Sequence, residues 1–277
     1  MHFKKIISLV LVIGTILSLM GCGKTTPNGA STAGNQPEKK NIIVGTSPIF
    51  KDILIAAKDE FNKEGYTLEV KVFDDLVTPN IALQEGSVDM SFHQHEPYLT
   101  QYNKSKGTDL VKYNGGIVKY FMGIYSDKIK NVNDLKDGAS VSVPNDPSNR
   151  GRALKALQAN GLIKLKEGVD TPTKLDIVEN KKNLNIVEMD VIKLVSSLKD
   201  VDCSTIISVV AVNGNLDPTS AIAVEDPGES AKYAIIIVLN KEKHSEAVAA
   251  RLETSLKSEK VKKFLEERYK GAVLPAF

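Results

Sequence analysis

Two short segments carry most of the side chains that could do chemistry, and the more informative one is the turn PNDPSNRGRAL at 144–154. Its prolines favour extended backbone, and Ser148 or Asn149 could cap a helix that follows. The free N–H groups at the start of such a helix favour an anion. Arg152 lies about one turn inside and could hold the same anion through two hydrogen bonds. The turn therefore indicates either a carboxylate site or an ordinary capped helix with an arginine in solvent.

The second segment is FHQHEPYL at 92–99, which follows a predicted strand. Ligands of α/β sheets gather beyond the carboxyl ends of strands. His93 and His95 could lie on one strand face and bind a metal. Zinc needs a third and usually a fourth ligand, and neither Glu96 nor His244 has a spacing that supplies one. We therefore favour a pocket in which one imidazole hydrogen-bonds a ligand, and we expect no metal or other cofactor.

Enzyme signatures are missing from the sequence. It contains no GxxxxGK[ST] phosphate loop, no GxSxG elbow, and no CxxC or HExxH metal motif. The adjacent acids Asp74 and Asp75 would point to opposite faces of a strand and could not act together. We expect a binding protein rather than an enzyme.

The N-terminus has the features of an export signal. Two lysines precede an apolar run at 6–19 that is too short to span a bilayer comfortably, and the run ends in Leu-Met-Gly-Cys. We predict a lipoprotein signal peptide at 1–21 and lipid attachment at Cys22. The alternative is an ordinary signal peptide followed by a chance cysteine. Small, polar and proline residues dominate 22–40, which indicates a lipidated flexible tether.

Charge and cysteine content narrow the choice further. Lys4 and Lys5 are the only charged residues of the predicted signal peptide, and without them 34 basic residues face 34 acidic ones. This balance gives no electrostatic reason to expect nucleic acid. Cys203 is the second of two cysteines. If Cys22 carries lipid, Cys203 has no disulfide partner, and its apolar surroundings predict a small buried side chain.

Strand and helix periodicities alternate along the remaining chain, which predicts strands mostly parallel to one another and covered by helices. Strands are predicted at 41–46, 67–73, 87–92, 116–126, 139–144, 183–190, 203–208 and 231–240. Helices are predicted at 50–61, 78–86, 148–160 and 191–198 and from 245 onward. The strand at 116–126 is long enough to cross between two lobes. We therefore predict an α/β fold with two lobes.

At the two segments described first, the chain resembles the methionine-binding lipoproteins of the NlpA/MetQ type. The matching stretches are SVDMSFHQHEPYL, GIYSDKIKNVNDLKDGASVSVPNDPSNRGRAL, LQANGLIKLKEGV and LDIVENKKNLNIVEMD. The resemblance implies a periplasmic-binding-protein-like fold whose lobes close about a hinge. One lobe would contain 41–120 and 225–277, and the other 121–224.

The resemblance also implies site residues. His95 and Tyr98 match the family's QHxPYL segment, and Tyr120 matches a tyrosine that precedes the YS strand end. Asn149 and Arg152 match the polar residues that hold the charged backbone end of an amino acid. These five residues are the predicted ligand-binding site.

Four positions depart from the family's pattern. Leu76 replaces a tyrosine, Ile207 and Ile235 replace asparagines, and His93 replaces a phenylalanine. Isoleucine offers no acceptor to an ammonium group, and each lost charged hydrogen bond costs about 1.5–3 kcal/mol. We therefore expect L-methionine to bind more weakly than about micromolar.

The resemblance implies a substrate-binding lipoprotein of an ABC importer, anchored by lipid on the extracytoplasmic face of the cell membrane. Its partners would be methionine or a related small molecule, the importer's permease and its ATPase. One alternative is a binding lipoprotein of the same fold for a more apolar or less charged ligand. Another is a surface lipoprotein that acts as an adhesin or sensor.

Overall fold

The structure, a computed structural model, describes residues 39–277. The predicted signal peptide, Cys22 and the predicted tether up to residue 38 lie outside the described residues. No helix within 39–277 is long and apolar enough to cross a bilayer.

Six strands form the first sheet. In spatial order they are β13 (Val273–Pro275), β4 (Val111–Tyr120), β12 (Ile235–Leu239), β3 (Met90–His95), β1 (Asn41–Thr46) and β2 (Thr67–Val72). The strands β1, β2 and β3 are parallel, whereas β12, β4 and β13 join in antiparallel pairs. The prediction of parallel strands is therefore confirmed for β1, β2 and β3, and in the second sheet for the neighbouring strands at 140–144, 185–189 and 203–207, whereas the pairings of β12, β4 and β13 are antiparallel.

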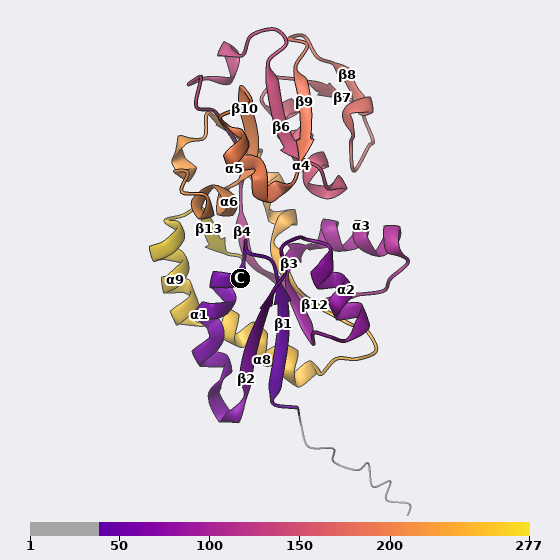
Figure 1. Cartoon of the computed structure of the whole chain (residues 1–277), viewed down its shortest axis with the longest axis vertical. Helices are drawn as coiled ribbons and strands as arrows, with labels where there is room; N and C mark the ends of the chain where they lie inside the picture. Colours follow the sequence, from indigo (N-terminus) through magenta and orange to yellow (C-terminus); the bar gives the residue numbers. More distant parts are fainter. Residues whose placement is uncertain (1–38) are drawn as a thin grey trace, which may run out of the picture. The chain divides into compact units, whose positions relative to one another are not determined.

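Helices cover both faces of this sheet (Figure 1). On one face lie α1 (Lys51–Phe61), α8 (Glu246–Leu256) and α9 (Glu259–Tyr269), and on the other α2 (Thr78–Glu85) and α3 (Glu96–Lys106). The strand β12 has apolar side chains on both faces of the sheet, and helices bury both sets. Ile235 and Ile237 belong to the core under α1, whereas Ile236 and Val238 belong to the core under α2 and α3. A strand buried on both sides has an unbroken apolar sequence.

Five strands form the second sheet. In spatial order they are β11 (Ala223–Val224), β5 (Met122–Tyr125), β10 (Cys203–Ile207), β6 (Ser140–Pro144) and β9 (Asn185–Met189). A separate hairpin pairs β7 (Lys164–Leu165) with β8 (Ile177–Glu179). Cys203 is fully buried in β10, as its apolar surroundings predicted.

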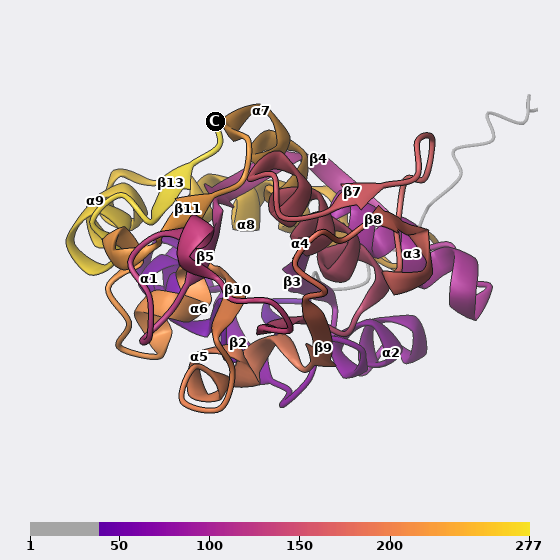
Figure 2. The same cartoon turned by 90° about the horizontal axis from the view of Figure 1, so that it is seen from above.

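The remaining helices belong to the second half of the chain. They are α4 (Pro147–Ala159), α5 (Leu194–Ser197), α6 (Ser208–Asn213) and α7 (Pro227–Ser230). Short 3₁₀ helices are η1 (Lys63–Gly65), η2 (Val132–Asp134), η3 (Lys174–Asp176), η4 (Val191–Lys193), η5 (Pro218–Ser220) and η6 (Ala231–Tyr233). Figure 2 shows α4 between the five-stranded sheet and the β7–β8 hairpin.

The chain passes twice between the two sheets. The first passage is at Phe121, between β4 and β5, and the second lies between β11 and β12. The predicted strand at 116–126 does cross as expected, but it is two strands rather than one. The α/β class with two lobes is confirmed.

Other boundaries differ from the predictions for identifiable reasons. The strand β3 starts three residues later than predicted and ends at His95. The first half of the segment at 92–99, which we predicted to follow this strand, is therefore part of it. The helix α3 was not predicted, because its second half, residues 101–106, carries one large apolar residue, Tyr102. Residues 231–233 form η6 rather than the start of β12.

Candidate ligand-binding site

Residues from both sheets and their loops meet around a small cavity. Its lining consists of Ile49, Phe50, Leu76, His93, Gln94, His95, Tyr98, Tyr120, Asn149, Val191 and Ile207. The cavity volume is about 10 Å³, which is space for about one water molecule. A ligand of amino-acid size therefore requires the lining residues to move apart. Four of the five predicted site residues lie here; Arg152 is not part of the lining.

His95 joins the two halves of the site. It is the N-cap of α3, where its Nδ1 accepts a hydrogen bond from the backbone N–H of Tyr98 at 3.2 Å. Its Nε2 lies 3.1 Å from Oδ1 of Asn149, at the start of α4. Because Nδ1 accepts, Nε2 carries the proton and donates to the asparagine. Burial, with the nearby charge of Arg152, lowers the pKa of His95 to about 3.

The start of α4 differs from the prediction in one respect. The capping residue is Asp146, not Ser148 or Asn149, and Pro147 follows it as the first helical residue. The Asp146 carboxylate accepts from the backbone N–H of Asn149 at 2.9 Å and from its side-chain amide at 3.0 Å. Burial raises the pKa of Asp146. The chain's own carboxylate thus occupies the helix N-terminus where we expected a ligand anion.

Arg152 is buried and forms a two-point ion pair with Glu225. Its Nε donates to Glu225 Oε2 at 2.8 Å, and its Nη2 donates to Oε1 at 2.5 Å and to the carbonyl of Tyr120 at 2.9 Å. The guanidinium packs on the ring of Tyr233 at 4.2 Å and on that of Tyr120 at 5.0 Å. Burial opposes the charge of Arg152, but the hydrogen bond and charge of Glu225 raise its pKa. Two of its nitrogens are therefore engaged, and Nη1 is buried without a partner among residues 39–277.

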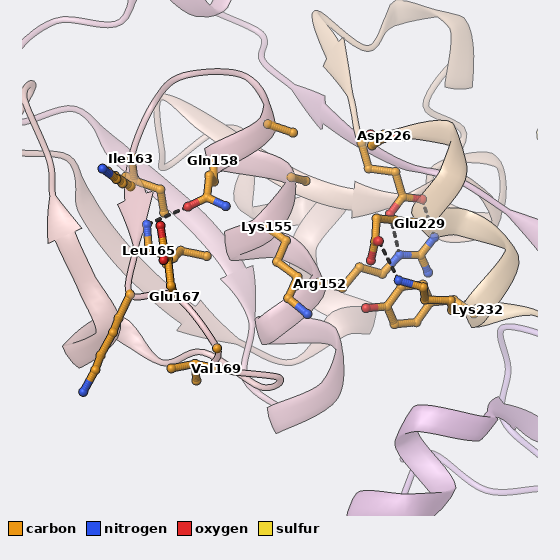
Figure 3. A pocket seen from close by; sticks show the side chains of 17 residues that line it. Arg152, Lys155, Gln158, Ile163, Leu165, Glu167, Val169, Asp226, Glu229 and Lys232 are labelled. Carbon is orange, nitrogen blue, oxygen red and sulfur yellow. Dashed lines mark hydrogen bonds and ion pairs between the residues drawn. The ribbon is translucent and has the colours of Figure 1, made fainter.

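A second, larger cavity of about 710 Å³ lies on the other side of Arg152, between α4, residues 163–169 and residues 225–233. Figure 3 shows Arg152 beside Lys232 at one end and Lys155 and Gln158 projecting from α4. Most of these groups already have partners. Lys155 donates to the carbonyl of Asp170 at 2.8 Å, and Lys232 pairs with Glu229 at 2.6 Å. The smaller cavity contains four of the five predicted site residues, whereas the larger one contains Arg152 alone of the five.

The departures noted in the sequence lie in or beside this smaller cavity. Leu76, His93 and Ile207 line it. Ile235 is fully buried and pairs with His95 across the β3–β12 ladder. Leu76 and Ile207 thus place aliphatic side chains in the lining and His93 places an imidazole there, whereas Ile235 lies outside the lining.

Some features of the site could not be read from the sequence. No local signal connects Glu225 with Arg152, which is 73 residues away. Ile49, Phe50 and Val191 carry only the apolar signal of core residues. Within residues 39–277, no group of three or more His, Cys, Asp or Glu side chains could hold a metal ion.

Comparison with known proteins shows which family the chain belongs to. Residues 42–277 match the family model described as NlpA lipoprotein. The chain belongs to the NlpA lipoprotein family. This is a family of binding proteins rather than enzymes, and the resemblance seen in the sequence is confirmed.

Several NlpA relatives are similar over most of their length. The D-methionine-binding lipoprotein MetQ of Escherichia coli is 39% identical over 252 residues, which cover 89% of this chain and 88% of the relative. A solved nutrient-binding protein from Burkholderia cenocepacia, bound to methionine, is 37% identical with a TM-score of 0.81, covering 85% of this chain and 100% of that one. A solved periplasmic substrate-binding protein of an ABC transporter from Coxiella burnetii is 34% identical with a TM-score of 0.79, covering 84% and 99%.

Proposed function

We propose that this chain captures methionine or a related small molecule outside the cell membrane and delivers it to an ABC importer. The observation that carries the proposal is the small cavity in which His95, at the end of β3 in the first sheet, hydrogen-bonds Asn149, in the first turn of α4, which packs on the second sheet. A ligand that fills this cavity would contact both sheets and so favour their closed arrangement. The names of the relatives in E. coli and B. cenocepacia support methionine as the first ligand to test.

The ligand-binding residues in this proposal are His95, Tyr98, Tyr120, Asn149 and Arg152. The first four line the cavity, and Arg152 lies behind the ring of Tyr120. Arg152 would support the site by fixing Tyr120, and its unpaired Nη1 is a donor that a ligand carboxylate could use after rearrangement. The chemistry is binding alone, with no residue in a catalytic role.

The cycle would be opening and closing about the two passages between the sheets. The moving bodies would be 41–120 with 225–277 and 121–224. Closed protein would dock on the importer's permease, which an ATPase drives. Lipid on Cys22 would hold the protein at the extracytoplasmic face of the membrane.

A second candidate is a more apolar or less charged ligand, favoured by Leu76 and Ile207 in the lining. An adhesin or sensor role is less well supported, because neither requires an enclosed cavity.

Mass spectrometry of the small molecule released from purified, denatured protein tests the proposal, followed by calorimetric titration of ligand-free protein. Methionine or a close relative in the released fraction is the expected result. Failure to find or bind any small molecule would contradict ligand capture.

A further inference from the structure

The cavity contains one hydrogen-bonding nitrogen that the protein does not use. Most of its polar side chains are engaged. Gln94 exchanges two hydrogen bonds with Asn80 at 3.0 and 2.6 Å. Both ring nitrogens of His95 have partners, and Asn149 is held by His95 and Asp146.

Tyrosines of the lining are engaged as well. The hydroxyl of Tyr98 donates to the carbonyl of Leu76 at 3.0 Å, and Tyr120 packs on Arg152. His93 is different. It is 2% exposed, it lines the cavity, and its Nδ1 is the one buried side-chain nitrogen of this lining, within residues 39–277, that has no partner.

The contact of His93 Nε2 with a backbone carbonyl determines whether Nδ1 is a donor or an acceptor. Nε2 of His93 lies 3.1 Å from the carbonyl oxygen of Leu76. A carbonyl oxygen only accepts, so Nε2 must carry the proton. Burial lowers the pKa of His93 to about 4, so the ring is neutral near pH 7. Nδ1 is then a lone-pair acceptor with no donor, and a buried group of this kind is costly to leave unpaired.

We propose that His93 Nδ1 is the specificity-determining acceptor of this cavity and selects ligands that present a single N–H or O–H donor to it. The inference rests on the proposed function, because it assigns the ligand to the same cavity. It adds a ligand class: a small, largely apolar molecule with one uncharged donor.

An ammonium group satisfies this site poorly. It has three N–H donors, whereas the side chains of the lining offer one free acceptor nitrogen, and Ile207 and Leu76 offer none. Each further donor would have to compete for an acceptor that the protein already uses, such as the side-chain oxygens of Gln94 and Asn149. A hydroxyl group presents one donor and no charge, so it should suit the cavity better.

Three matched probes separate these possibilities. L-methionine carries an ammonium group, 2-hydroxy-4-(methylthio)butanoate carries a hydroxyl group in its place, and 4-(methylthio)butanoate carries neither. Calorimetric titration of ligand-free wild-type protein should give the hydroxy compound about tenfold higher affinity than the compound without a donor. L-methionine should bind more weakly than the hydroxy compound.

Two substitutions test the two ring nitrogens of His93 separately. In His93→Gln, the amide nitrogen of the glutamine can still donate to the carbonyl of Leu76. No acceptor then remains at the place of the imidazole Nδ1. His93→Asn keeps a polar atom near Nδ1 and gives up the contact with Leu76. We expect His93→Gln to abolish the preference for the hydroxy compound and His93→Asn to retain most of it.

His244→Gln is the matched control, since His244 lies outside the cavity and bonds to Asn240 and Glu246. It should leave all three affinities unchanged. If wild-type protein binds the probes without the preference, or if His93→Gln keeps it, the inference is overturned and the proposed function stands. If wild-type protein binds none of the three probes, the methionine-like function falls and the inference falls with it.

Discussion

His93 and His95 are neutral, buried imidazoles whose protonation would oppose folding. Burial lowers the pKa of His93 to about 4 and that of His95 to about 3. In the unfolded chain both would titrate near about 6.5. Below that pH the unfolded chain binds more protons than the folded one, so stability falls as the pH falls.

This linkage predicts a specific pH dependence. Between pH 7 and pH 5, each histidine should remove about 2 kcal/mol from the free energy of unfolding. His93→Gln should therefore lose about 2 kcal/mol less than wild type over this interval. Urea unfolding at both pH values measures the difference, and carboxylates common to both proteins cancel. Equal losses in the two proteins would mean that His93 is protonated in the folded state.

The ion pair of Arg152 and Glu225 allows a second prediction. Both side chains are buried, so removing one leaves an uncompensated charge. We expect Arg152→Met and Glu225→Gln each to lower the free energy of unfolding by about 3–5 kcal/mol. The double variant should lose clearly less than the sum, because neither charge is then left unpaired. Additive losses in denaturant unfolding would show that the two side chains do not act as a pair.

At this scale, sequence reasoning named residues that the structure brings to one cavity, although their roles in binding stay predictions. His95 and Tyr98 lie within one helical turn, and Asn149 lies in a recognisable turn before a helix. It failed where the partner is distant. We expected Arg152 to form two hydrogen bonds with a ligand carboxylate, and in the structure the carboxylate of Glu225 accepts two hydrogen bonds from it.

The element that positions Asn149 is α4, whose first turn is fixed by Asp146. The carboxylate satisfies N–H groups that would otherwise be unpaired and also holds the amide of Asn149. The amide oxygen of Asn149 is thereby directed toward His95. A local helix cap thus aligns a contact between the two sheets.

We predict that Asp146→Ala lowers the free energy of unfolding by about 1 kcal/mol, the usual value of an N-cap. It should also weaken ligand binding, because Asn149 loses its support. Asp146→Asn keeps a capping oxygen and should restore most of the stability. Thermal unfolding and calorimetry of the three proteins measure both effects. An alanine variant as stable as wild type would rule out Asp146 as the cap.

Elements with strong periodicity were predicted well, whereas those defined by tertiary pairing were not. The helix α1 buries Ile53, Leu54, Ala57 and Phe61 at helical spacing. By contrast, the break between β4 and β5 arises because one continuous β-rich run enters two different sheets. The start of β3 depends on its pairing with β1 and β12, which no local pattern encodes.

At the scale of the whole molecule, several hydrogen bonds join residues of the two predicted lobes across and beside the site. Nη2 of Arg152 donates to the carbonyl of Tyr120 at 2.9 Å, and the hydroxyl of Ser208 donates to the carbonyl of Ala272 at 2.5 Å. His95 contacts Asn149, and the side-chain amide of Asn213 donates to the carbonyl of Ile49 at 3.0 Å. Opening would break these hydrogen bonds and separate apolar side chains of a buried cluster that residues of both sheets share, and it is required because the cavity of about 10 Å³ admits no amino acid.

The two cysteines of the chain allow the proposed membrane anchor to be tested with an internal control. Cys22 follows the predicted signal peptide, whereas Cys203 is buried in β10, and burial raises the pKa of its thiol to about 12. Two or three acyl chains on Cys22 would hold the protein firmly on a membrane, since each buried methylene contributes about 0.8 kcal/mol.

We expect Cys22→Ser to move the protein from the detergent phase to the aqueous phase, or to leave it as an unprocessed precursor. Cys203→Ala should remain in the detergent phase like wild type. Wild-type protein in the aqueous phase would refute the anchor. If Cys203→Ala moved to the aqueous phase and Cys22→Ser did not, the lipid would be attached to Cys203 and not to Cys22.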